Sequence, residues 1–142
     1  PMNFEFAAPP RVLFGPGTWK QAGPLARELG QRALVVTGAH PARAESLRNL
    51  LAAAGVDSAV FSVGGEPTTE MVRRGTAQGR EFGADLVMGF GGGSPLDAAK
   101  AMAALLANGG DPLDYMEVVG RGEPLLTPFH ASNLKVTKKY YF

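Results

Sequence analysis

Residues 86–100 read LVMGFGGGSPLDAAK: a short apolar run, three consecutive glycines and the start of an alanine-rich helical pattern. Glycine carries no Cβ, so the backbone at Gly91, Gly92 and Gly93 can adopt positive φ and another group can approach it closely. The first N–H groups of the following helix lack partners and lie at the positive end of its dipole. A strand, a glycine turn and a helix N-terminus together can hold a phosphate or pyrophosphate. Taken alone, the stretch is equally consistent with a tight turn that binds nothing.

Two further apolar runs, Ala33–Thr37 and Ser58–Val63, are typical of strands covered on both faces of a parallel sheet. Periodicity and end signals predict helices over Thr18–Leu29, Ala42–Ala54, Thr68–Phe82 and Ser94–Ala107, and one more turn within Asp111–Met116. Either Thr68 or Thr69 is expected to cap the third of these helices, and Gly83 is expected to end it. The first helix is expected to be capped by Thr18 and interrupted at Gly23-Pro24. This alternation predicts an α/β fold, a Rossmann-like parallel sheet flanked by helices.

The N-terminal residues differ from this pattern. Asn3–Phe6 and Arg11–Phe14 are short apolar stretches separated by Pro9-Pro10, which predicts a short edge hairpin.

Glycine-containing loops follow all three predicted buried strands, at Gly38–Pro41, Gly64–Pro67 and Gly89–Ser94. In open α/β sheets, ligands bind beyond the carboxyl ends of the strands, where these loops are expected to gather. Their combination favours a nucleotide or dinucleotide site over an unliganded turn.

Composition narrows the function classes. At 142 residues the chain suits one domain, and without cysteine it has no disulfide, thiolate metal site or cysteine nucleophile. Its net charge is +1, but Lys135, Lys138 and Lys139 lie in the last eight residues, which leaves eleven basic against thirteen acidic residues before them. That balance predicts no nucleic-acid partner. No apolar segment is long enough for a membrane span and no signal pattern begins the chain, so a cytoplasmic location is expected.

The stretch Gly91–Lys100, GGGSPLDAAK, resembles the GGGSxxDxxK signature of the iron-containing (group III) alcohol dehydrogenases. Shorter stretches match the family in the same order, namely RVLFGPG at 11–17, ALVVT at 33–37, PTT at 67–69 and DPLDY at 111–115. The resemblance runs from about Phe4 to about Pro128.

This resemblance implies an N-terminal α/β domain that binds NAD or NADP and a C-terminal helical domain that holds iron or zinc. Such enzymes transfer a hydride between an alcohol and an aldehyde or ketone while the metal polarises the substrate oxygen. Residues 1–128 then form the NAD(P)-binding domain, and Phe129–Phe142 is an atypical tail. The family's metal ligands, an aspartate and three histidines, are expected to be missing from the 142 residues, whose only histidines are His40 and His130.

The resemblance also assigns cofactor contacts. The backbone of Gly91, Gly92, Gly93 and Ser94 would hold the pyrophosphate, with Asp97 toward the nicotinamide side and Pro67 in the second loop. Without the family, the spacing of Asp97 and Lys100 favours an exposed helix pair over a cofactor contact, with Asp97 in the first turn complementing the dipole.

Cofactor choice depends on Gly38, which stands where many NAD-preferring members have an aspartate for the ribose 2′-hydroxyl. Its lack of an acid favours NADP over NAD, with His40 or Arg43 as a counter-charge for the 2′-phosphate. Glu66 stands where the family often has asparagine.

We therefore expect a dehydrogenase domain that binds NADP but does not catalyse hydride transfer alone. One alternative is a nucleotide-binding module that self-assembles as a homo-oligomer through the surface left by the missing domain. Another is an enzyme completed in trans by a separate metal-domain chain. The pair Arg73-Arg74 is interpreted as a solvated helix face.

Overall fold

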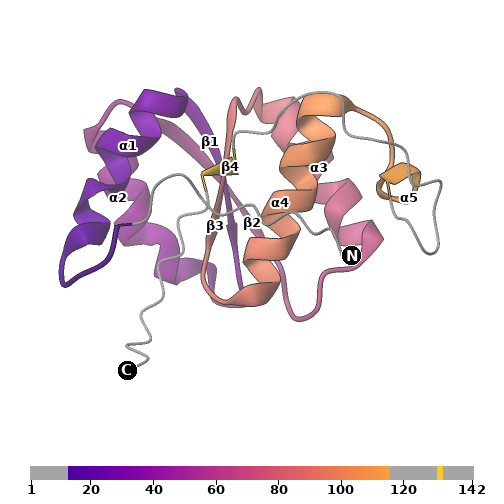
Figure 1. The fold of residues 1–142 in the computed structure, drawn as a ribbon, viewed down its shortest axis with the longest axis horizontal. Coiled ribbons are helices and arrows are strands. Elements are labelled where there is room, and N and C mark those ends of the chain that lie inside the picture. Colours follow the sequence, from indigo (N-terminus) through magenta and orange to yellow (C-terminus); the bar gives the residue numbers. More distant parts are fainter. Residues whose placement is uncertain (1–12, 116–130, 133–142) are drawn as a thin grey trace, which may run out of the picture.

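The computed structural model describes residues 13–115 together with 131 and 132. Four parallel strands form its sheet: β1 (Arg32–Thr37), β2 (Asp57–Ser62), β3 (Leu86–Phe90) and β4 (Ala131–Ser132). Their order is β2-β1-β3-β4, with helices on both faces (Figure 1). The predicted Rossmann-like α/β fold is therefore confirmed, while the predicted N-terminal edge hairpin lies outside the described residues.

Strand β2 differs from its prediction. Of its six residues only Phe61 is buried, whereas five of the six residues of β1 are buried. The reason is its position: within the described residues β2 lies at one edge of the sheet and β1 lies inside it. At the other end of the sheet, Ala131 and Ser132 from the predicted tail pair with Val87 and Met88 of β3.

The first helix also differs from its prediction. A short 3-10 turn, Thr18–Gln21, precedes α1 (Ala22–Leu29), and the Thr18 hydroxyl donates to the Gly15 carbonyl at 2.9 Å instead of capping the helix. Gly23-Pro24 does not interrupt α1, because Pro24 lies in its first turn, where a missing N–H costs no helical hydrogen bond.

The remaining helices lie close to their predicted positions. A 3-10 turn, Pro41–Ala44, leads into α2 (Glu45–Ala53), and α3 spans Thr69–Phe82. The Thr68 side chain caps α3 by accepting from the Met71 N–H at 3.1 Å. Helix α4 (Gly93–Asn108) and the single turn α5 (Pro112–Tyr115) complete the order, and no described helix is long and apolar enough to cross a membrane.

The two faces of the sheet carry separate cores. Ala33 and Val35 of β1 pack against α1 and α2, together with the fully buried Leu47 and Leu51 of α2. Leu34 and Val36, which point the other way along the same strand, belong to the core with α3 and α4. Burying such a side chain contributes about 1.5–3 kcal/mol, so both helix layers hold the sheet firmly.

Candidate functional site

The strands β1, β2 and β3 end at the same level. Thr37 of β1 lies opposite Ser62 of β2 and opposite Phe90 of β3, so the loops that follow all start from one edge of the sheet. The chain passes from β1 to β2 on one side and then returns to β3 on the other side of β1. The strand order therefore reverses between β1 and β3, and such a switch point is where open α/β sheets bind ligands.

Gly91 brings the β1 and β3 loops together at this switch point. Its φ of 136° is one that side-chain-bearing residues rarely adopt. A Cβ built on Gly91 would lie 3.0 Å from Pro95 Cγ and 4.0 Å from the Gly38 nitrogen. The predicted site residues Gly38 and Gly91 are therefore neighbours, although they are far apart in the sequence.

Three of the predicted glycines border open space. Among the described residues, and apart from the neighbouring backbone, a Cβ built on Gly38, Gly92 or Gly93 would meet no atom within 4 Å. The fold itself therefore does not need glycine at these positions to avoid a steric clash. A ligand that approaches the backbone closely would need glycine there.

Helix α4 presents its N-terminus to the same space. It begins at Gly93 without a side-chain cap, and its first backbone bond runs from the Leu96 N–H to the Gly92 carbonyl at 3.4 Å. The N–H groups of Gly93 and Ser94 thus have no partner within the helix and suit an anion. The helix begins one residue earlier than predicted, so Asp97 is its fifth residue and not in the first turn.

Gly89 begins the third predicted loop, but its role in positioning α4 was not predicted. A Cβ there would lie 2.7 Å from Leu96 Cδ2 and 3.2 Å from Ala99 Cβ. Its absence lets α4 pack directly on the end of β3, which sets where the helix N-terminus lies. The available signal was a glycine inside an otherwise apolar strand.

Hydroxyl groups hold the β1 loop in place. The Gly38 carbonyl accepts from the Ser62 hydroxyl at 2.8 Å and from the Thr37 hydroxyl at 3.1 Å. Neither hydroxyl was predicted as part of the site. Beyond Gly38, the side chains of His40 and Arg43 are exposed, with His40 immediately before the 3-10 turn.

Comparison with known proteins agrees with this geometry. The family model described as iron-containing alcohol dehydrogenase matches residues 9–132, which is most of the chain. The chain belongs to this family.

Individual relatives show how much of the family's length is present. Sulfoacetaldehyde reductase from Bilophila wadsworthia is 33% identical over 80% of the chain and 30% of its own length. NAD-dependent methanol dehydrogenase from Bacillus methanolicus is 31% identical over 86% of the chain and 33% of its own length. The crystal structure of a 1,3-propanediol oxidoreductase superposes with a TM-score of 0.75 at 29% identity, over 82% of the chain and 32% of that structure. The chain thus spans about a third of these relatives.

In this dehydrogenase-family chain, the structure shows no contact of two other predicted site residues with the glycine loops. Asp97 is exposed, and its carboxylate lies 3.5 Å from Lys100 Nζ, so the structure shows the helix pair that was the alternative interpretation. Pro67 is half-buried in the loop between β2 and α3. The start of this loop is held against β1, because the Val63 N–H donates to the Thr37 carbonyl at 2.7 Å. Their cofactor contacts stay predictions.

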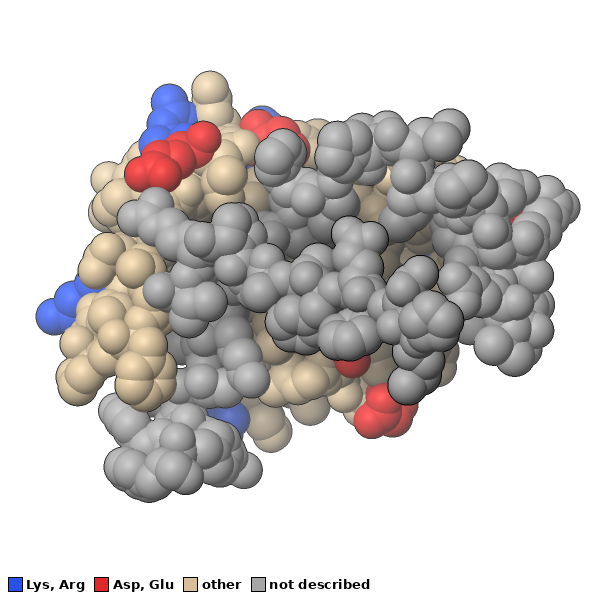
Figure 2. Space-filling model, in the orientation of Figure 1, with Lys and Arg blue, Asp and Glu red and all other residues tan. Residues whose placement is uncertain are grey.

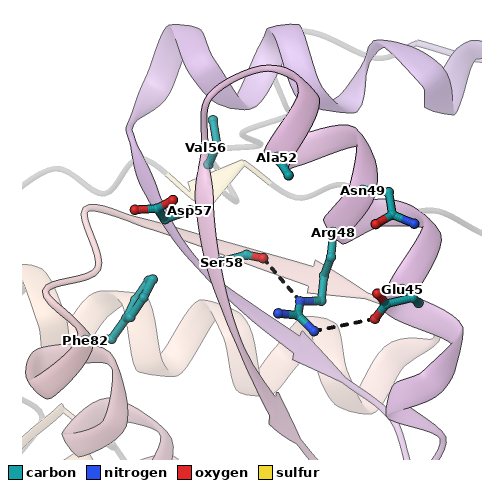
Figure 3. Close-up of a pocket in the computed structure, with 8 residues that line it drawn as sticks. All are labelled: Glu45, Arg48, Asn49, Ala52, Val56, Asp57, Ser58 and Phe82. Atoms are coloured by element: carbon teal, nitrogen blue, oxygen red, sulfur yellow. Dashed lines mark hydrogen bonds and ion pairs between the residues drawn. The ribbon is translucent and has the colours of Figure 1, made fainter.

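A hollow elsewhere on the molecule is a poorer candidate. It lies beside the amino end of β2, at the opposite end of that strand from the glycine loops, and is lined mainly by α2 and β2 residues with Phe82 below (Figure 3). Arg48 crosses it, donating to the Ser58 hydroxyl at 3.3 Å and pairing with Glu45 at 3.4 Å. The one described cation that lines the hollow, Arg48, is thus already paired, and the hollow is open to solvent.

The described residues do not fit the family's metal. Among them, no three histidine, aspartate or glutamate side chains gather as a metal site would require.

Charged side chains are dispersed on the face of the molecule in Figure 2. The visible described Lys and Arg side chains lie apart at the margin of this face, interspersed with Asp and Glu.

Proposed function

We propose that this chain is the dinucleotide-binding part of an alcohol dehydrogenase-type oxidoreductase, and that it binds NADP(H) in preference to NAD(H). The observation that carries the proposal is the convergence of Gly38, Gly91 and the open α4 N-terminus at the switch point between β1 and β3. The dinucleotide, when bound, supplies or accepts the hydride exchanged between an alcohol and an aldehyde or ketone.

The chain's own residues would bind and orient that cofactor. The N–H groups of Gly93 and Ser94 would donate to the pyrophosphate, helped by the positive end of the α4 dipole. Gly92 and Gly93 leave the space through which phosphate oxygens approach the backbone. Pro67 and Asp97 would contact the cofactor on either side of this centre.

The preference for NADP rests on the β1 loop. Gly38 places no carboxylate beside the adenosine ribose, and its open side has room for a 2′-phosphate. The exposed His40 and Arg43 follow within five residues and offer counter-charge. The methanol dehydrogenase relative is named NAD-dependent, so we attribute the NADP preference of this chain to its own loop and not to the family.

We also propose that the binding domain is formed by residues 1–128 together with β4, which pairs with β3, and that hydride transfer needs groups beyond the 142 residues. The family's iron or zinc would polarise the substrate oxygen. The described part of the chain brings no set of ligands together for it. Steady-state assays with added iron or zinc and a simple alcohol should therefore show no turnover, and clear turnover would contradict this part of the proposal.

Calorimetric titration of NADP⁺ and NAD⁺ tests the function directly. We expect NADP⁺ to bind more tightly, and Gly38→Asp to reverse the order. A carboxylate beside a 2′-phosphate should weaken NADP⁺ by about tenfold to a hundredfold because like charges then face each other. If neither dinucleotide binds the unaltered chain, the proposed function is wrong. If both bind and Gly38→Asp leaves their ratio unchanged, only the NADP assignment is wrong.

The predicted homo-oligomer stays a prediction. Light scattering at high protein concentration measures it, and a monomer would count against the self-assembling alternative.

A further inference from the structure

Ser62 has a contact that links two loops of the proposed cofactor site. It is the last residue of β2, and its hydroxyl donates to the Gly38 carbonyl at 2.8 Å, across 24 positions of sequence. The Thr37 hydroxyl, on a side chain that is 1% exposed, donates to the same oxygen at 3.1 Å. Two hydroxyl donors on one carbonyl fix its direction.

That direction determines where the next N–H points. The described peptide bonds are all trans, so the Ala39 N–H points opposite to the Gly38 carbonyl. The carbonyl faces Ser62 at the end of β2, and β1 lies between β2 and β3. The Ala39 N–H therefore points away from Ser62, and it has no hydrogen-bond partner within the described part of the chain.

Gly38 could not hold this orientation by itself. Without a Cβ it permits the 38–39 peptide to rotate, and no described atom outside its chain neighbours lies within 4 Å of the place where a Cβ would be. The Ser62 hydroxyl supplies the restraint that the glycine lacks. Removing it would leave only the longer bond from Thr37.

We infer that Ser62 is a positioning residue for the adenosine end of the cofactor, which it acts on through the 38–39 peptide. The inference rests on the proposed function. With Ser62 in place, the oriented Ala39 N–H offers a hydrogen-bond donor to the ribose 2′ substituent. The pyrophosphate site at the start of α4 does not depend on Ser62. Loss of Ser62 should therefore weaken ligands that carry the adenosine ribose and leave the other half of the dinucleotide unaffected.

Calorimetry on Ser62→Ala with three probes tests this selectivity: NADP⁺, adenosine 2′,5′-bisphosphate and nicotinamide mononucleotide. We expect a loss of about three- to tenfold for the first two, the range of one hydrogen bond, and no change for the third. Ser62→Thr keeps the hydroxyl and should restore the affinity. Ser58→Ala is the matched control, because it removes a hydroxyl from the same strand whose partner is Arg48 in the hollow of Figure 3.

The outcomes separate the inference from the function. Dinucleotide binding that is unchanged in Ser62→Ala overturns the inference and leaves the proposed function standing. Equal losses for all three probes overturn it as well, because they indicate a general structural role. Absence of any dinucleotide binding by the unaltered chain overturns both.

Discussion

The strands of the sheet are held differently at their two ends, here called the amino edge and the carboxyl edge after the direction of the parallel strands. At the amino edge, the Asp85 carboxylate before β3 accepts from the N–H groups of Gln31 at 3.0 Å and Arg32 at 2.9 Å. Arg32 continues the network: its Nε donates to the Phe82 carbonyl at 2.9 Å, and its guanidinium lies 4.5 Å from the centre of the Phe82 ring. Side chains there tie β1, β3 and the end of α3 to one another.

At the carboxyl edge, few side chains intervene. Two hydroxyls hold the Gly38 carbonyl, while Gly38, Gly92 and Gly93 face open space. The backbone donors at this edge stay available to a ligand because neighbouring side chains do not occupy them. From this contrast we expect substitutions at the amino edge to change mainly the stability of the fold, and substitutions at the carboxyl edge to change mainly the proposed cofactor binding.

The largest expected effect is at the carboxyl edge. Gly93→Ala places a methyl group in the open space without touching another residue, so the melting temperature should be unchanged while NADP⁺ affinity falls about a hundredfold, roughly 2.8 kcal/mol. Thermal unfolding and calorimetry on the same sample measure both. Gly91→Ala is the matched contrast: its φ of 136° makes alanine strained, so that variant should lose about 1–3 kcal/mol of folding free energy. If the Gly93→Ala protein binds NADP⁺ with unchanged affinity, the pyrophosphate does not bind at this position.

At the amino edge we expect a substitution to lower stability and to leave NADP⁺ affinity unchanged. Asp85→Ala removes the acceptor for two backbone N–H groups, and we expect the free energy of unfolding to fall by about 1 kcal/mol, a value reduced by the exposure of the carboxylate. NADP⁺ affinity should stay the same. Urea denaturation of Asp57→Ala is the control, since the Asp57 carboxylate accepts no hydrogen bond from the described residues. A loss of cofactor affinity in Asp85→Ala would show that the two edges are coupled.

The smallest expected effect is at Asp111, which joins α5 to α3. Arg73, predicted as part of a solvated helix face, instead donates to both Asp111 oxygens, one of them at 2.9 Å. This pairing and the Leu113 N–H hold the pKa of Asp111 well below its ordinary 3.8, at about 2. Because the folded-state pKa is the lower one, the stabilising contribution is complete above pH 3.8 and is lost as the pH falls through about 2.

Denaturant unfolding of Asp111→Asn at several pH values measures this contribution. The variant should be less stable than the unaltered chain at pH 5, and the difference should shrink as the pH falls toward 2. Arg74→Gln, a neighbouring exposed change in α3, should lack this pH dependence. A difference that stays constant between pH 5 and pH 2 would mean that the Arg73 pair adds nothing to stability.

The elements of the core could be predicted because their signals are local. The apolar runs gave β1 and β3, and Thr68 with Gly83 marked the ends of α3, since caps and periodicity act within a few residues. The start of α1 could not be placed in this way. Gly23 packs against the backbone of Leu50 in α2, a contact between helices that no local pattern contains.

The candidate site divides in the same manner. Its glycines and its family were already determined by the sequence, because a loop that must approach phosphate uses residues without a Cβ wherever it occurs. The partial exposure of β2 and the contact of Ser62 with Gly38 were decided only by the tertiary structure. Each depends on which strands lie side by side or which way a side chain turns, and those follow from packing of distant segments that the order of residues does not display.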